Sequence, residues 1–213
     1  MWLLLAAVAL VVWLVRQTVV MGLGLALSAT ITVVAAGLLS WAAVAEVAWQ
    51  WHERVYTAAI APVTSGDSRV RCQRMIETMI DLDGNAGHVD GNADGSLGRV
   101  AHLDRDMCTR LSHLPDRAAD ASLSTVQALH VLAHEAEHVA GVRSESAADC
   151  YAIQHTAAVA VGLGISAAEG QAYAHRYLVE AYPHMPDNYR STSGCRAGGE
   201  LDLQLPGFVW PSG

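Results

Sequence analysis

The feature that most constrains this chain is a long uncharged run near its N-terminus. No charged residue occurs from Thr18 to Ala45. Because a helix rises about 1.5 Å per residue, this run is longer than the roughly 30 Å hydrocarbon core of a bilayer. The segment from Trp2 to Val15 is also wholly apolar, but it is only marginally long enough for a second span. We therefore expect residues 1–51 to form a membrane anchor in contact with the lipid bilayer.

Two arrangements of the anchor are open, because Arg16 and Gln17 separate the two apolar segments. The chain forms either a hairpin of two transmembrane helices, which we favour, or one transmembrane helix preceded by a shallow apolar segment. In both, Arg16 is the only positive charge near the early boundary and belongs on the cytoplasmic side. Three tryptophans at the far end of the run are typical of a membrane interface: Trp41, Trp49 and Trp51.

A cleaved signal peptide is the alternative interpretation of the N-terminus, because Ala43, Val44 and Ala45 have the small-x-small form of a cleavage site. The apolar run is much longer than the roughly 7 to 15 residues usual for a signal peptide, which favours a retained anchor. We expect a protein of the cell membrane whose residues 52–213 form an extracytoplasmic domain. The formal net charge of -8, without a basic stripe, excludes nucleic acid as an expected partner.

Four dispersed cysteines follow the apolar run, and none belongs to a CxxC pair: Cys72, Cys108, Cys150 and Cys195. This spacing is not that of a zinc finger. Beyond a membrane anchor, an even number of dispersed cysteines favours two disulfides over four buried thiols. Four cysteines allow three pairings, of which we expect Cys72 with Cys108 and Cys150 with Cys195.

The pattern of apolar residues after Trp51 predicts a mainly α-helical domain with a small β element. One strand is expected at Leu97–Leu103. Capping residues and apolar spacing predict five helices: Arg69–Ile80, a short helix from Asp104 to Leu111, one from Ser124 or Thr125 to Val139, Glu145–Val161, and one from Ser166 to Ala181.

The loop between the first predicted helix and the strand is rich in Asp, Asn and Gly. Asp90, Asn92, Asp94 and Gly95 match positions 1, 3, 5 and 6 of a calcium-binding EF loop. Position 12, which requires a bidentate Glu, is Ala101. A turn-rich surface loop is therefore the better interpretation, because the same residue types favour turns.

The motif that carries chemistry is HEAEH, which falls on the predicted helix ending at Val139. His134 and His138 are four residues apart, so their rings project from one helix face and can converge on a metal ion. Glu135 follows the first of them, in the position of a general base beside a catalytic zinc. The sequence therefore predicts Zn²⁺ bound by the two histidines, with Glu135 as the catalytic residue.

The third metal ligand is expected in the segment that follows. Glu145 and Asp149 are one helical turn apart and would lie on the next helix, after the chain reverses at Gly141. We favour Glu145 as the ligand and Asp149 as the residue that supports a ligating imidazole by a hydrogen bond, although the two roles can be exchanged. His130, one turn before His134, is better interpreted as a polar core or surface histidine than as a ligand.

These residues resemble the zincin metallopeptidases, and more narrowly the gluzincins, whose HExxH helix is followed by a helix bearing a Glu ligand, often as ExxAD. Here the pair is Glu145 and Asp149, and only six residues separate Glu145 from His138, fewer than is usual in gluzincins. The metzincin pattern would place a ligand at Ser144, a poor one. The stretch from about Leu97 to Leu203 is similar to small bacterial membrane proteins with a zincin-like core, which implies that fold and a bound metal.

Two functions of different classes follow. The leading expectation is a membrane-anchored zinc metallopeptidase that hydrolyses peptide bonds of a protein or peptide substrate by zinc-activated water. The alternative is a non-catalytic envelope protein or interaction module in which the metal is structural, as the irregular spacing of the third ligand suggests. The other polar aromatic candidates receive no role: His155, His175, Tyr151 and Tyr177.

Overall fold

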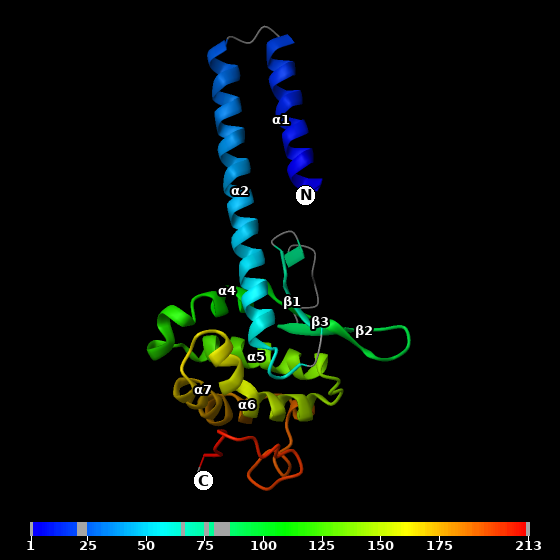
Figure 1. Ribbon diagram of the computed structural model, residues 1–213, viewed down its shortest axis with the longest axis vertical. Helices are drawn as coiled ribbons and strands as arrows, with labels where there is room; N and C mark the ends of the chain where they lie inside the picture. The colour runs from blue at the N-terminus through cyan, green and yellow to red at the C-terminus, as the bar shows by residue number, and fades with distance from the viewer. Residues whose placement is uncertain (1, 21–24, 65–66, 75–76, 79–85, 212–213) are drawn as a thin grey trace. The chain divides into compact units, whose positions relative to one another are not determined.

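The computed structural model describes residues 2–20, 25–64, 67–74, 77–78 and 86–211. The chain divides into two compact units, Met1–Trp51 and His52–Gly213. The division falls at the boundary expected between the anchor and the outer domain. The location of the two units relative to a membrane stays a prediction. Of the helices, α1 (Trp2–Val20) lies in the first unit, and α2 (Leu25–Ala59) begins there and ends in the second (Figure 1).

Helix α2 contains the segment that is long and apolar enough to cross a membrane. This segment is Thr30–Ala59, with a mean hydropathy of 1.9. None of its apolar window is buried within the protein. The exposed large apolar side chains of α2 are Val33, Val34, Leu38, Trp41, Val44, Val47 and Trp51. The choice between one and two passes stays open, and residues 21–24, between α1 and α2, lie outside the described part of the chain.

The second unit begins with the end of α2, which belongs to its core. Tyr56, Ala59 and Ile60 are buried, and the Tyr56 hydroxyl donates a hydrogen bond to the Cys108 carbonyl oxygen at 2.9 Å. Gly162 lies against this helix end, because a Cβ there would be 2.5 Å from the Ala59 Cα. Residues 52–60 therefore contribute to the core of the second unit.

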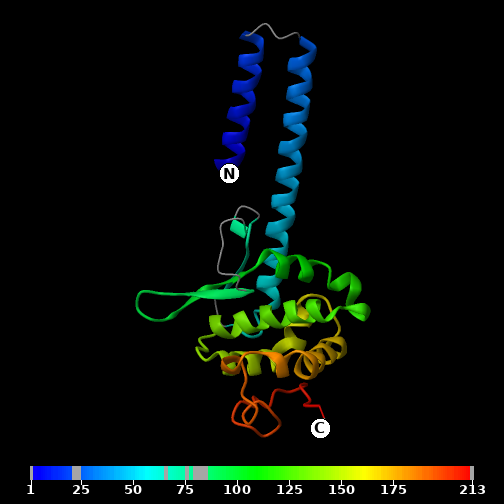
Figure 2. The ribbon, with the colours of Figure 1, turned by 180° about the vertical axis from the view of Figure 1, so that it is seen from behind.

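A three-stranded sheet forms one side of the second unit, with strand order β1-β3-β2. Strand β1 (Arg69–Cys72) pairs in parallel with β3 (Leu97–Leu103), and β2 (Gly87–Gly91) pairs with β3 in the antiparallel sense. The β2–β3 hairpin projects from the helices (Figure 2). The strand predicted at Leu97–Leu103 is present with the expected bounds.

Two predictions in this region are wrong. The helix expected at Arg69–Ile80 begins instead as strand β1, in which Val70 and Cys72 are buried and Arg69 and Arg71 are exposed. This alternation has the period of a strand. Residues 75–76 and 79–80 of the expected helix lie outside the described residues. Strand β2 lies within the expected loop, although the turn that follows it agrees with that expectation.

The remaining helices lie close to their predicted positions. They are α4 (Arg105–Ser112), α5 (Leu123–Val139), α6 (Glu145–Gly162) and α7 (Ala167–Glu180). Asp104 caps α4, Ser144 caps α6, and Ser166 forms the expected capping box with Glu169. The cap of α5 is Ser122, not Ser124 or Thr125. The fold class, mainly α with a small β element, is confirmed.

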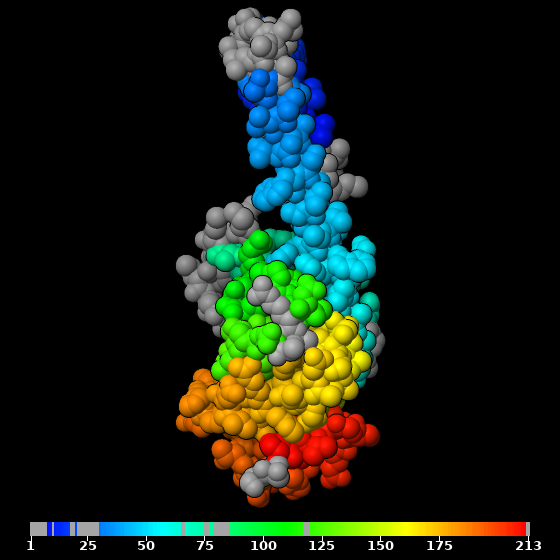
Figure 3. All heavy atoms as spheres, turned by 90° about the vertical axis from the view of Figure 1, so that its left-hand side faces the viewer, coloured from blue at the N-terminus to red at the C-terminus, as the bar shows by residue number. Residues whose placement is uncertain are grey.

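Helix α5 is the centre of the second unit. It contacts β2, β3, α4, α6 and α7. Helices α6 and α7 lie side by side in the space-filling view (Figure 3). They approach closely because Gly170 has no side chain, and a Cβ there would be 2.8 Å from the Ala157 Cα. This packing buries almost every residue of α5 from Val126 to His138.

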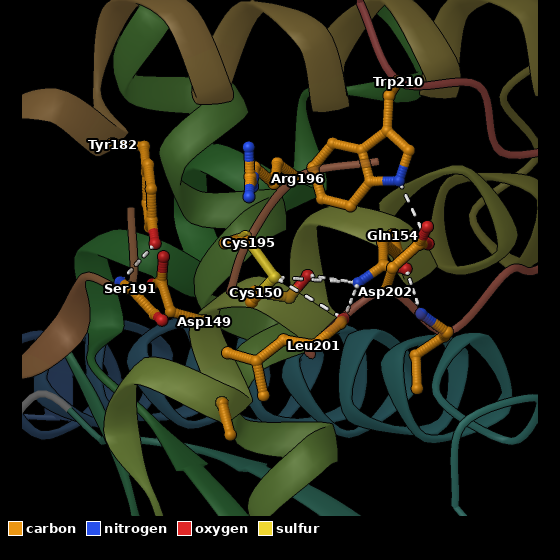
Figure 4. Close-up of a disulfide and its surroundings, with 12 residues drawn as sticks. Asp149, Cys150, Gln154, Tyr182, Ser191, Cys195, Arg196, Leu201, Asp202 and Trp210 are labelled. Carbon is orange, nitrogen blue, oxygen red and sulfur yellow. Dashed lines mark hydrogen bonds between the residues drawn. A yellow bond between two sulfur atoms is a disulfide. The ribbon is translucent and has the colours of Figure 1, made fainter. Parts of the chain in front are cut away.

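Three short 3-10 helices complete the second unit. They are η1 (Pro115–Asp120), η2 (Tyr182–His184) and η3 (Asp187–Tyr189). Disulfides join Cys72 to Cys108 and Cys150 to Cys195, the same pairs that the sequence predicted. The second disulfide ties the C-terminal segment to α6, where Gln154 also donates a hydrogen bond to the Leu201 carbonyl oxygen at 2.8 Å (Figure 4).

Candidate metal centre

Helix α5 presents the three residues of the predicted motif toward the sheet and α6. His134, Glu135 and His138 are all buried, with 6%, 4% and 8% of their surface exposed. The helix ends at Val139, and Gly141 adopts a φ of +103°, a backbone conformation that favours glycine. The chain thereby reverses within a few residues of His138.

The reversal brings the first residue of α6 to the two histidines. Ser144 caps α6, and Glu145 follows it in the first turn. The Glu145 Oε2 atom lies 3.1 Å from His134 Nε2 and 3.4 Å from His138 Nε2, and the two Nε2 atoms are 3.0 Å apart. The structure thus brings together the three residues predicted as metal ligands.

The protons of the two imidazoles determine what this triangle of atoms can bind. His138 Nδ1–H donates to the Val142 carbonyl oxygen at 2.7 Å, so its Nε2 carries a lone pair. His134 Nδ1 faces the Asp149 carboxylate at 3.6 Å, which favours a proton on Nδ1 there also. With these tautomers the two Nε2 atoms and the Glu145 oxygen are three acceptors that point at one another. A cation between them would satisfy all three.

The dimensions of the triangle fit a tetrahedral metal ion. Ligand atoms at about 2.1 Å from a tetrahedral zinc ion lie about 3.4 Å from each other. The three observed separations are 3.0, 3.1 and 3.4 Å. Two imidazoles and one carboxylate also form a ligand set that suits such an ion. The residues present therefore fit a bound metal.

Asp149 lies on α6, one turn after Glu145, and faces His134. It is 1% exposed and accepts hydrogen bonds from His130 Nε2 at 2.8 Å and from the Tyr177 hydroxyl at 3.2 Å. Burial raises the pKa of this carboxyl, but His130 and His134 outweigh burial and lower it well below its usual range. Asp149 is therefore a carboxylate that faces the His134 ring, and its support of a metal ligand stays a prediction.

A second set of potential ligand atoms lies next to the first and shares His134 with it: His130, His134 and Asp149. The set that contains Glu145 is the better candidate for a metal ion. His130 Nε2 already donates to Asp149, and its ring stacks on Tyr177 with centroids 3.5 Å apart. These contacts agree with the interpretation of His130 as a core histidine. The carboxylates around His134 outweigh the effect of burial and raise its pKa, so the centre attracts positive charge.

Glu135 lies beside the triangle in a water-poor environment. Burial raises the pKa of its carboxyl to about 7. Among the described residues, no hydrogen-bond partner reaches its Oε2 atom. Strand β2 approaches closely at Gly87, where a Cβ would be 2.8 Å from Glu135 Cγ and Oε1. The side chain is thus enclosed, with one oxygen available to a ligand of the site.

Two cavities open onto the centre. One is a cleft of about 250 Å³ that reaches His138, Glu145 and Val89 of β2. The other is a pocket of about 320 Å³ that reaches Asp149 and Tyr177. Both are lined by Gly87, His134, Glu135 and Tyr189. A metal held by the triangle would therefore face open space on the side of Glu135.

Tyr189 is the residue of this site that sequence reasoning missed. It lies on η3, and its ring centroid is 5.7 Å from that of His134. Burial, with Glu145 next in effect, raises the pKa of its phenol, which keeps the O–H as a donor. No motif surrounds it. The four residues without an assigned role do not join the triangle, although Tyr177 contacts Asp149 and His155 donates to Glu137 at 2.6 Å.

Comparisons with known proteins give no match, so the interpretation of the site rests on its geometry. No protein-family model, no curated protein and no solved structure matches the chain.

Proposed function

We propose that this protein is a membrane-anchored, zincin-like metallopeptidase that binds zinc through His134, His138 and Glu145. The observation that carries the proposal is the triangle of three acceptor atoms, which opens to two cavities beside the buried Glu135. A structural zinc site is usually closed by four protein ligands, whereas a catalytic one keeps an open position. The three-ligand set and its open side therefore favour catalysis.

Glu135 has the position of the general base. Bound zinc would supply Lewis acidity, which polarises a carbonyl and acidifies water. Glu135 accepts a proton from the water that attacks the amide carbon, and the C–N bond then breaks. It returns that proton to the leaving nitrogen, so that the products are a carboxylic acid and an amine. Tyr189, which lines both cavities with Glu135, is placed to donate a hydrogen bond to the substrate.

Strand β2 favours an extended peptide as the substrate. Within the described part of the chain it pairs only with β3, and it is an edge of the sheet. Its residues Gly87 and Val89 line the cleft. An extended peptide can add to such an edge through backbone hydrogen bonds. The substrate class is therefore a protein or peptide segment that can adopt a strand.

The proposed location is the cell membrane, with α2 as a transmembrane helix and the site outside the cytoplasm. The length and apolar character of Thr30–Ala59 support the span. The two disulfides support an oxidising compartment for the second unit. This arrangement favours a substrate that lies in the cell membrane or near its extracytoplasmic surface.

Zinc content and hydrolysis test the proposal together. The full-length protein, purified in detergent without reduction, is assayed for zinc by elemental analysis and for cleavage of a mixture of unfolded polypeptides. We expect one strongly bound zinc in the wild type and its loss in His134→Ala and Glu145→Ala. We expect Glu135→Gln to keep this zinc and to lose cleavage by at least about 100-fold.

The comparison of these variants separates the candidate functions. Glu137→Gln is the matched control, because Glu137 is also a buried acid of α5 but pairs with His155. Cleavage that persists in Glu135→Gln contradicts the role of Glu135. Bound zinc without any cleavage by the wild type favours the alternative, an envelope protein with a structural metal.

A further inference from the structure

A second group of metal-ligating side chains lies on the sheet, apart from the centre described above. His88 of β2 and His102 of β3 are directly opposite each other in the antiparallel register. Asp90 follows His88 by two residues, so both side chains project from the same face of β2. The neighbouring Ala101 and Leu103 of β3 are buried on the opposite face, which packs on α5.

The three side chains converge. The two imidazole rings stack with centroids 4.8 Å apart and planes 6° apart. The Asp90 carboxylate lies 3.3 Å from His102 Nε2 and 3.8 Å from His88 Nε2. One ligand atom from each residue lies within 4.8 Å of the others. On average, the carboxylate–imidazole separations are longer than the 3.1 and 3.4 Å of the buried centre, and the side chains of His88 and Asp90 are 53% and 71% exposed, which leaves them room to close on an ion.

The backbone brings the carboxylate to the imidazoles. The register of the β2–β3 ladder shifts between Val89 and Gly91, so Asp90 lies at an irregularity of the sheet. Gly98 of β3 permits it, because a Cβ at that position would be 2.9 Å from the Asp90 carbonyl oxygen. Such irregularities re-aim side chains and recur next to functional sites.

We propose that His88, Asp90 and His102 bind a second divalent transition-metal ion, of the zinc or copper class. Two imidazoles favour such ions over calcium or magnesium, which prefer oxygen ligands. The loop does not supply those oxygens together, since Asp94 accepts hydrogen bonds from the Ser96 backbone N–H and hydroxyl at 2.9 and 2.6 Å. Arg71, a cation near His102, forms an ion pair with Glu77, which offsets its repulsion of a metal ion.

A metal ion at this site has a consequence for the cleft. It cross-links β2 to β3 at His88. The residue before His88 is Gly87, and Gly87 lies against Glu135. The occupied site therefore fixes the strand that lines the cleft. Its exposed ligands make it the weaker and more readily exchanged of the two sites.

Zinc titration of the full-length protein in detergent tests the proposal. Metal-free protein is dialysed against increasing concentrations of Zn²⁺ alone, and bound zinc is measured by elemental analysis. We expect two zinc ions in the wild type, and one in a His88→Ala/His102→Ala variant. Asp90→Asn should weaken the second ion by at least about tenfold without removing the first.

The buried centre is tested separately in the same experiment. His134→Ala should bind only the weaker ion, and its combination with His88→Ala/His102→Ala should bind none. The controls His113→Ala and His184→Ala replace exposed histidines elsewhere and should retain two ions. A weaker ion that survives His88→Ala/His102→Ala, or that is lost in the controls, overturns the second site, whatever the result for His134→Ala.

Discussion

At the scale of single residues, Gly87 offers the first test of the site. Replacing it by alanine adds a single methyl group beside Glu135. The Cβ of Gly87→Ala would overlap the enclosed Glu135 side chain. We expect the free energy of unfolding to fall by about 1–3 kcal/mol, measured by denaturant titration. The displaced carboxylate should reduce peptide hydrolysis by about 100-fold while the strongly bound zinc remains.

Gly91→Ala is the matched control for this substitution. Gly91 lies on the same strand, and nothing lies within 4 Å of a Cβ built there. We expect its unfolding free energy to stay within about 0.5 kcal/mol of the wild type. Equal effects of the two substitutions would show that β2 responds to lost glycine flexibility and not to the contact with Glu135.

Asp149 offers a second test at this scale, because we propose that it supports a metal ligand without binding the metal. Asp149→Asn keeps the size of the side chain but removes the charge that faces His134 and accepts from His130. We expect zinc affinity, measured by competition with a chelator, to fall about 10–100-fold. A complete loss of zinc would instead make Asp149 a direct ligand. The control Glu137→Gln should leave the zinc affinity unchanged.

At the scale of elements, the two disulfides join β1 to α4 and α6 to the C-terminal segment, outside the turn between α5 and α6. Replacing Cys150 and Cys195 by serine frees the C-terminal segment from α6 and should lower the unfolding free energy by about 2–5 kcal/mol. Strongly bound zinc should remain, because its ligands lie on α5 and α6. If the variant loses that zinc while Cys72–Cys108 stays oxidised, the Cys150–Cys195 disulfide also orients α6.

The elements that were predictable from sequence are those determined by neighbouring residues. Ser144 and Ser166 mark the starts of α6 and α7 through local caps, and Gly141 marks the end of α5. Strands β1 and β2 were missed because each is short, and β1 pairs with β3 across an intervening segment. Tyr189 reaches the site from beyond α7, and no local pattern indicates such a contact.

At the scale of the whole molecule, the proposed membrane location rests on the apolar run of α2. Val33 lies near the middle of the uncharged run and is 71% exposed. An arginine at the centre of a transmembrane helix costs about 2.5–3.5 kcal/mol on insertion scales. We therefore expect Val33→Arg to reduce the fraction of protein that stays in membranes after an alkaline carbonate wash.

Gln50→Arg is the control for this change, since Gln50 lies on the same helix but beyond the uncharged run. It should leave the membrane-bound fraction as in the wild type. If Val33→Arg also leaves that fraction unchanged, α2 is not the anchor.

The proposed metal ligands span only residues 134–145, on two consecutive helices joined by a tight turn. Contacts this close in the chain form quickly, because little loop-closure entropy is lost. The parallel pairing of β1 with β3 and the disulfide to Cys195 join segments much farther apart. During synthesis, the α5–α6 hairpin could therefore capture a metal ion before the C-terminal segment has emerged, and the ion would then serve as a nucleus on which later contacts assemble.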